Sequence, residues 1–272
     1  MRFKARNKTL DLSKPVLMGV LNVTPDSFSD GGKFLHPDSA IQHAKQMVQE
    51  GASIIDIGGE SSRPGAKEIT AKEELRRVLP VVQGLKDADA VLSIDTCKAD
   101  VAEQCLQNGA HVINDIYGLQ DPKLRQVVAR HEAAAIVMHM QGTPQTMQKS
   151  PTYGDVVAEV KEFLQRQTDQ TKMDGIQSVA VDPGIGFGKS LEHNLELLNR
   201  LDEIVSLGFP ICVGVSRKSF IGTLTGDLAE GRQEGTLAAV ATCVLKGAKI
   251  LRVHDVAACR KAVDVAWAIH HG

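Results

Sequence analysis

The sequence predicts a (β/α)8 barrel, a fold in which eight parallel strands close into a cylinder and a helix follows each strand. Eight short apolar runs occur along the 272 residues, each followed by an amphipathic segment. Runs that are apolar at nearly every position are typical of strands buried on both faces. The runs end about 33 residues apart, the length of one strand and its helix. An open, doubly wound sheet is the alternative, but it rarely needs eight evenly spaced units.

The N-terminal residues alternate between charged and apolar, which predicts a short β-hairpin that turns at Asn7-Lys8. The barrel strands are then expected over residues 15–23, 53–58, 90–96, 111–116, 134–140, 178–184, 210–216 and 249–255. In the helix after the first of these, Asp38 is the expected N-cap and Gly51 lies just past the end. Thr70 and Glu73 have the spacing of a capping box for the next helix. No linker divides the chain, so residues 1–272 are expected to form one domain.

The composition excludes several classes of protein. A net charge of -2 with 43% hydrophobic residues is typical of a soluble globular protein. No basic run indicates nucleic acid binding, and no apolar stretch is long enough for a membrane span. The N-terminus lacks the apolar core of a signal peptide, and the five cysteines show no paired spacing. We therefore expect a cytoplasmic protein that acts on small molecules.

Residues 181–190, VDPGIGFGKS, end like a phosphate-binding loop. That motif requires glycine at the position that Pro183 occupies, and the glycines at 184, 186 and 188 do not fit the dinucleotide spacing either. These glycines therefore need another explanation.

Active sites of such barrels lie at the carboxyl ends of the strands. Two long loops with glycine, at residues 22–34 and 58–68, are expected to act as lids over this end. Any single polar side chain there could instead cap a helix or close a turn. The polar residues at the expected strand ends are Asn22, Asp56, Asp95, Asn114, Asp115, His139, Asp182, Ser216, Arg217, Lys218, Arg252, His254 and Asp255.

Eight motifs, in chain order, resemble those of the dihydropteroate synthase family of folate biosynthesis. They are GVLNVTPDSFSDGG, IIDIGGESSRPGA, SIDT, INDI, MHMQGTP, VDPGIGFGK, GVSRKSFIG and RVHDV. The resemblance implies a (β/α)8 barrel, usually a homodimer, which joins 4-aminobenzoate to 6-hydroxymethyl-7,8-dihydropterin diphosphate with Mg²⁺ and releases pyrophosphate. The family is the target of sulfonamide inhibitors.

The resemblance assigns the pterin to the end of the sixth strand. A carboxylate can accept both N–H groups of the pterin's aminopyrimidine edge, and Asp182 matches the family's residue for this role. Asn114 suits the remaining edge because an amide both donates and accepts. Asp95 would lie deep in the same pocket, Lys218 would donate to the ring, and the apolar walls would be Ile116, Met138 and Phe187. The glycines would let the backbone pass close to the ring, and Lys189-Ser190 would begin the next helix.

The diphosphate is expected at the last strand. Arg252 and His254 are two residues apart, so both side chains can point to one side, and arginine suits bidentate phosphate contacts. Ser62 and Arg63 would close over the diphosphate, and Asn22 matches the family's Mg²⁺ ligand. An ion pair of Arg252 with a neighbouring aspartate is the alternative.

The aminobenzoate slot is expected to include residues of three loops. The residues are Phe28, Ser62, Arg63, Pro64, Phe187, Lys218 and Ser219. The implied mechanism is dissociative, with Asp95, Lys218 and Arg63 as catalytic residues. Ser62 stands where the family commonly has threonine, and we expect sensitivity to sulfonamides because no residues are inserted there. A pterin-dependent methyltransferase of the same barrel family would share Asp95, Asn114 and Asp182 but would not need the diphosphate site. A non-catalytic pterin-binding protein would not need it either.

Overall fold

Eight parallel strands form a barrel in the computed structural model, which describes residues 1–24, 37–63 and 65–272. The strands pair in the order β8-β7-β6-β5-β4-β3-β10-β9, and a bridge between Val181 and Ile211 brings β8 to β9. The predicted barrel is therefore confirmed, and an open doubly wound sheet is excluded. The strands are β3 (Val16–Asn22), β4 (Ala52–Gly58), β5 (Val91–Asp95), β6 (Val112–Asp115), β7 (Ala134–Met138), β8 (Val179–Asp182), β9 (Cys212–Gly214) and β10 (Ile250–Val253).

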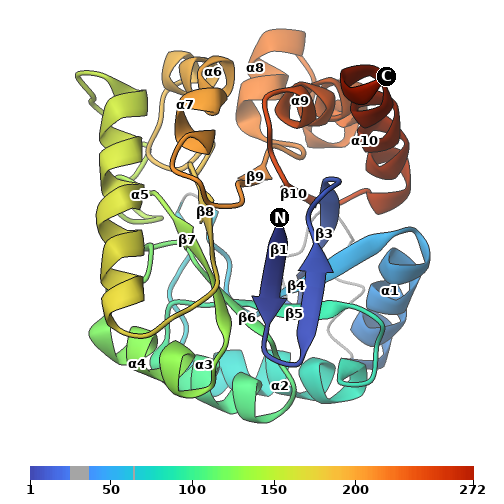
Figure 1. Ribbon diagram of the computed structural model, residues 1–272, viewed down its shortest axis with the longest axis vertical. Helices are drawn as coiled ribbons and strands as arrows, with labels where there is room; N and C mark the ends of the chain where they lie inside the picture. Colours follow the sequence, from blue (N-terminus) through green and yellow to red (C-terminus); the bar gives the residue numbers. More distant parts are fainter. Residues whose placement is uncertain (25–36, 64) are drawn as a thin grey trace.

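Helices surround the barrel (Figure 1). Their buried side chains pack on the strand residues that face outward, such as Ile55, Ile94 and Val137. No helix in the described part of the chain is long and apolar enough to cross a membrane. The helices are α1 (Pro37–Gln49), α2 (Ala71–Leu85), α3 (Ala99–Gln107), α4 (Pro122–Arg130), α5 (Val156–Met173), α6 (Leu191–Asn199), α7 (Leu201–Val205), α8 (Ser219–Thr225), α9 (Gln233–Leu245) and α10 (Val256–His271), with a 3-10 turn, η1 (Ala229–Gly231).

The barrel interior changes from apolar to polar along its length. Alternate residues of a strand point to the same face. Near the amino ends of the strands, the inward side chains form an apolar cluster that includes Met18, Ile54 and Val91. Two or four residues further along the same strands stand Asn22, Asp56 and Asp95. This change places the polar groups at the carboxyl ends, where the sequence predicted them.

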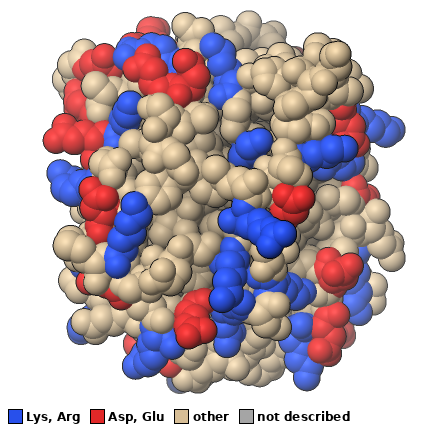
Figure 2. Space-filling view, viewed as in Figure 1, with Lys and Arg blue, Asp and Glu red and all other residues tan. Residues whose placement is uncertain are grey.

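The N-terminal hairpin covers the apolar end of the barrel. It consists of β1 (Arg2–Ala5) and β2 (Lys8–Asp11), and Phe3 belongs to the interior cluster (Figure 1). Lys and Arg side chains gather over this end of the molecule (Figure 2). The hairpin is confirmed, but its turn is Arg6-Asn7, one residue earlier than predicted. Arg6 takes a positive φ of 56° there and donates to the carbonyl oxygens of Leu106 and Ala110.

The helix ends differ from prediction at two places. Asp38 lies in the first turn of α1 and is not its N-cap, whereas Gly51 follows the helix with a φ of 104°, as expected. Thr70 caps α2 by accepting from the Glu73 amide at 3.2 Å. The predicted capping box is nevertheless wrong, because the Glu73 carboxylate bonds Arg76 and Arg77 instead of the Thr70 amide.

Candidate active site

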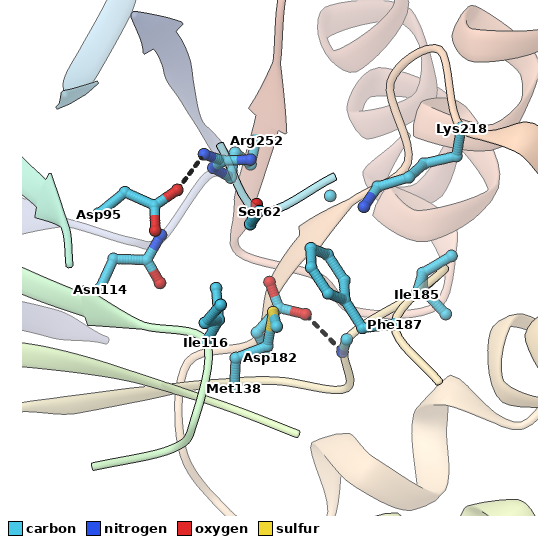
Figure 3. Close-up of a pocket in the computed structure, with 12 residues that line it drawn as sticks. Ser62, Asp95, Asn114, Ile116, Met138, Asp182, Ile185, Phe187, Lys218 and Arg252 are labelled. Atoms are coloured by element: carbon cyan, nitrogen blue, oxygen red, sulfur yellow. Dashed lines mark hydrogen bonds and ion pairs between the residues drawn. The ribbon is translucent and has the colours of Figure 1, made fainter. Parts of the chain in front are cut away.

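A small cavity lies at the carboxyl ends of the strands, where barrel enzymes have their active sites. Figure 3 shows its side chains converging from opposite sides of the barrel. All the predicted pterin residues line it, namely Asp95, Asn114, Ile116, Met138, Asp182, Phe187 and Lys218. Ser62 and Arg252 line it as well. Asp95 and Arg252, 157 positions apart in the sequence, thus share one space because the closed barrel brings the carboxyl ends of its strands together.

A wider cleft opens beside this inner cavity and shares Asp95, Phe187, Lys218 and Arg252 with it. Of the residues predicted for the diphosphate and the aminobenzoate, this cleft contains Asn22, Ser62, Arg63, Ser219 and His254. The cleft also contains Arg217 and Arg232, which were not predicted as ligands. Phe28 and Pro64 lie outside the described residues.

Asp182 is the buried carboxylate of the inner cavity, with 5% of its surface exposed. One oxygen, Oδ1, accepts from the Gly184 amide at 2.7 Å (Figure 3). Burial raises the pKa of Asp182, and the Gly184 amide and the cations of Lys218, Arg252 and Lys189 oppose that rise. These partners favour the charged carboxylate that a pair of N–H donors would need.

Arg252 ties two carboxylates together. Its Nε donates to Asp56 Oδ2 at 2.7 Å, and its Nη2 donates to Asp95 Oδ2 at 2.8 Å. The ion pair considered as the alternative role of Arg252 therefore exists. Within the described part of the chain, Nη1 makes no hydrogen bond, so one side of the guanidinium remains for a ligand in the shared space. The ion pair and a ligand contact are compatible.

Asp56 was expected among the polar residues at the strand ends but was given no role in binding or catalysis, although it organises this cluster. It is fully buried, and its Oδ2 also accepts from Asn114 Nδ2 at 3.1 Å. Burial raises the pKa of the neighbouring Asp95, the Arg252 guanidinium opposes that rise, and the Asp56 carboxylate adds to it. A charged residue between two isoleucines of β4 is the sequence signal that could have suggested this role for Asp56.

Lys218 lies over Phe187, with Nζ 4.1 Å from the centre of the ring. The cation and the ring thus form one wall of the inner cavity (Figure 3). Burial, together with the charge of Arg252, lowers the pKa of Lys218 to about 8, against the attraction of Asp182 and Asp95. The side chain is therefore mainly protonated at neutral pH.

The wider cleft has an excess of positive charge. Five cationic residues line it, against Glu60, Asp95 and Glu230. His254 adds no charge, because burial and the nearby cations lower its pKa to about 3. Its Nδ1 lies 3.1 Å from the Ser216 hydroxyl, so the neutral ring can donate from Nε2. Such a surface suits an anion with several charges. The cationic residues are Arg63, Arg217, Lys218, Arg232 and Arg252.

Other polar residues at the strand ends have structural roles. Both oxygens of Asp115 accept from backbone amides, those of Tyr117 and Leu119. Asp255 caps α10 by accepting from the Ala258 amide. For these residues the turn and cap interpretations are right.

Asn22 was predicted to hold Mg²⁺, and its place in the wider cleft is compatible with that role. The described residues contain no group of three or more His, Cys, Asp or Glu side chains that could hold a metal ion. Asn22 lines the wider cleft, and its side chain has one neutral carboxamide oxygen. This fits Mg²⁺, which commonly takes one or two protein oxygens and completes its octahedron with phosphate and water.

Comparisons with known proteins agree with this geometry. The model of the family described as "Pterin binding enzyme" matches residues 18–254. The dihydropteroate synthase of Haemophilus influenzae is 46% identical over 268 residues, which cover 97% of this chain and 98% of the relative. The chain belongs to the pterin-binding enzymes, among the dihydropteroate synthases.

Solved structures of this family superpose closely on the chain. The dihydropteroate synthase of Yersinia pestis, in a sulfonamide drug complex, has a TM-score of 0.97 and 45% identity, with 100% of both chains covered. That of Thermus thermophilus, in complex with 4-aminobenzoate, has a TM-score of 0.91 and 46% identity, covering 99% of this chain and 100% of the other. The resemblance stated from the motifs is thereby confirmed.

Proposed function

We propose that this protein condenses 6-hydroxymethyl-7,8-dihydropterin diphosphate with 4-aminobenzoate, giving 7,8-dihydropteroate and pyrophosphate. One observation supports this function above all: the inner cavity, with its buried carboxylate, opens directly into a cationic cleft. A substrate with a flat hydrogen-bonding ring and an anionic tail spans both. The Thermus thermophilus enzyme has been solved with 4-aminobenzoate and with 6HMPPP, which supports the same assignment.

The pterin occupies the inner cavity in this proposal. The Asp182 carboxylate accepts hydrogen bonds from the aminopyrimidine edge, and the Asn114 amide forms hydrogen bonds with the remaining edge of the ring. Lys218 donates to the ring from above, while Ile116 and Met138 form apolar walls. Because Asp182 is buried, its hydrogen bonds to the ligand are shielded from water and gain strength.

The diphosphate occupies the wider cleft. Arg252 offers Nη1, neutral His254 donates from Nε2, and Arg63 and Ser62 approach from the loop at residues 58–68. Asn22 would hold Mg²⁺, which when bound would neutralise part of the charge of the leaving group. Holding this charge lowers the barrier to departure.

The reaction begins when the bond between the pterin methylene and the diphosphate oxygen breaks, and the electron pair leaves with pyrophosphate. Electron density from the dihydropterin ring stabilises the resulting cation, and the Asp95 carboxylate favours its positive charge. The amine of 4-aminobenzoate then attacks the methylene, and its proton passes to solvent. An aromatic amine is already nucleophilic, so the reaction requires no strong general base.

The aminobenzoate slot borders the same cleft, between Ser62, Arg63, Phe187, Lys218 and Ser219. Sulfonamides resemble 4-aminobenzoate in shape and should compete for this slot. Ser62 retains the hydroxyl of the family's usual threonine and loses a methyl group, so binding of both ligands should persist with looser packing.

A product assay tests the function and separates the alternatives. The protein is incubated with the pterin diphosphate, 4-aminobenzoate and Mg²⁺, and pyrophosphate and dihydropteroate are both quantified. We expect equal amounts of the two products, with formation dependent on both substrates. A methyltransferase would instead transfer methyl groups from a methylated folate, and a non-catalytic pterin-binding protein would form no product.

We also propose that the protein acts in the cytoplasm as a homodimer, as the family resemblance implies. Large apolar side chains on α9 and α10 are exposed, Leu245 by 45%, Val265 by 60% and Ile269 by 73%. Contact with a second copy would bury them. Sedimentation equilibrium measures the mass directly, and a monomer at micromolar concentration would exclude the dimer.

A further inference from the structure

Lys189, from the Gly-Lys-Ser tail of residues 181–190, has no part in the reaction described above. Its side chain is only 3% exposed, which is rare for a lysine. The ammonium Nζ donates to the Phe187 carbonyl oxygen at 2.9 Å and lies 3.0 Å from His139 Nδ1. It therefore joins the end of β7 to the loop that carries Phe187.

The loop at residues 183–189, which we call the glycine loop, is fixed by close packing and by hydrogen bonds along most of its length. A side chain on Gly184 would clash with the His139 carbonyl oxygen, and one on Gly188 would clash with that of Gln141. Side chains also form hydrogen bonds with the loop backbone. Asp182 accepts from the Gly184 amide, and Asn194 accepts from the Gly186 amide. Gln148 donates to the Gly186 carbonyl oxygen, and Tyr153 donates to that of Gly188. The Phe187 carbonyl accepts from the Lys189 ammonium.

The charge of Lys189 also acts on Asp182. Burial raises the pKa of Asp182, and Lys189 is one of the cations that oppose the rise. Burial and the charge of Lys218 lower the pKa of Lys189 to about 7, while Asp182 raises it. His139, which follows β7 directly, faces the same ammonium, and burial and that ammonium lower its pKa to about 3, so the ring is neutral. A neutral His139 can accept the hydrogen bond from Lys189.

We propose that Lys189 is a positioning residue of the pterin site. Its buried ammonium fixes Phe187 against the cavity through the glycine loop and supplies a countercharge for the Asp182 carboxylate. The inference rests on the proposed function, since it concerns how that site holds the pterin. It gives the Gly-Lys-Ser tail a role that is unrelated to phosphate.

The test replaces Lys189 by methionine, which has similar length but neither charge nor donor. Calorimetry measures binding of 6-hydroxymethyl-7,8-dihydropterin and, separately, of pyrophosphate with Mg²⁺, for wild type, Lys189→Met and the matched control Lys123→Met. Lys123 is an exposed lysine of α4. We expect Lys189→Met to weaken pterin binding at least about tenfold. Pyrophosphate binding should change less than about twofold, and the control should match wild type.

The pH dependence provides a second readout. Without the Lys189 charge, the pKa of Asp182 rises further, so pterin binding should be lost at a higher pH in Lys189→Met than in wild type. Equal weakening of both ligands, or unchanged pterin affinity, would overturn the proposal, and an unshifted acid limb would remove its electrostatic part. If Lys189→Met does not fold, Lys189→Gln decides by the same comparison of ligands. Failure of wild type to bind the pterin would instead refute the proposed function.

Discussion

Asp182 determines the pterin assignment at the scale of single residues. In Asp182→Asn an amide replaces the carboxylate and cannot accept both N–H bonds, although the side chain keeps its size. Binding of 6-hydroxymethyl-7,8-dihydropterin should weaken by roughly a hundredfold, about 3 kcal/mol. Calorimetry with the bare pterin measures this directly. Near-normal affinity would show that the ring is recognised elsewhere.

Arg252 is expected to discriminate between two ligands. Arg252→Ala should weaken binding of the pterin diphosphate by at least about a hundredfold, because a charge-assisted phosphate contact is lost. The affinity for the bare pterin should fall much less. Because the change also leaves Asp56 and Asp95 unpaired, the melting temperature must be recorded, and Arg252→Lys provides a milder variant. Equal losses for both ligands would assign Arg252 to the fold alone.

Lys189 shows how far single residues could be interpreted from the sequence. Asp182, Asn114 and Asp95 were predicted because they end strands and match family motifs. Lys189 was expected only to begin a helix, and Ser190 does cap α6. Its buried contact with His139 depends on a residue 50 positions away, which no local pattern contains.

The loop at residues 58–68 is fixed at its base and lightly held at its tip. Arg77 donates to the Gly59 carbonyl oxygen, and Lys98 pairs with Glu60. Near the tip, two hydrogen bonds connect it to the loop after β7. The Gly65 amide donates to the Pro144 carbonyl oxygen, and the Gln145 side chain donates to that of Ala66. Arg63 between them is exposed, so a bound diphosphate can draw it inward at small cost.

We therefore predict an ordered mechanism, in which 4-aminobenzoate binds after the pterin diphosphate. A ligand shifts a loop only through contacts that differ between its states, and the diphosphate offers such contacts to Arg63 and Asn22. Alone, 4-aminobenzoate should bind at least about tenfold more weakly than with pterin and Mg²⁺-pyrophosphate present. Equilibrium binding of labelled 4-aminobenzoate gives both values. Equal affinities would mean that the slot is preformed.

Elements were predicted well where the pattern is long, and less well at their ends. All eight strands formed over the expected apolar runs, because such runs are typical of strands buried on both faces. Turns and caps depend on individual contacts. The Glu73 carboxylate bonds two arginines within its own helix instead of closing a capping box, and a local motif does not exclude that competition.

At the scale of the whole molecule, one end of the barrel provides stability and the other is polar. The hairpin and the apolar interior layer form the closed end, and the site occupies the other. The sequence predicted the polar end, because polar residues follow the apolar runs where the expected strands end. The docking of the hairpin over the barrel end was not predictable, since it needs contacts across about 100 residues, such as Arg6 with Ala110.

Buried neutral histidines should make the fold sensitive to acid. His111 accepts from the Leu92 amide at 3.0 Å, and burial lowers its pKa to about 4. The unfolded chain, with an ordinary pKa near 6.5, binds the proton first, so stability falls as pH decreases from about 6.5 through about 4. Between these pH values, His111 lowers the free energy of unfolding by an amount on the order of 3 kcal/mol.

Thermal melts between pH 8 and pH 4 test this expectation. His111→Asn keeps an acceptor near the Leu92 amide and cannot titrate, so its melting temperature should fall less steeply with acid than that of wild type. His270→Asn, at an exposed position of α10, serves as the control and should follow wild type. Parallel curves for His111→Asn and wild type would disprove the role of His111.

A crystal structure with the bound pterin diphosphate tests the central assignment most directly. We expect the aminopyrimidine edge against Asp182 and Asn114, and the diphosphate in the wider cleft beside Arg252, His254 and Arg63. The opposite orientation would contradict this assignment, as would a ligand seated away from the space between Asp182 and Arg252.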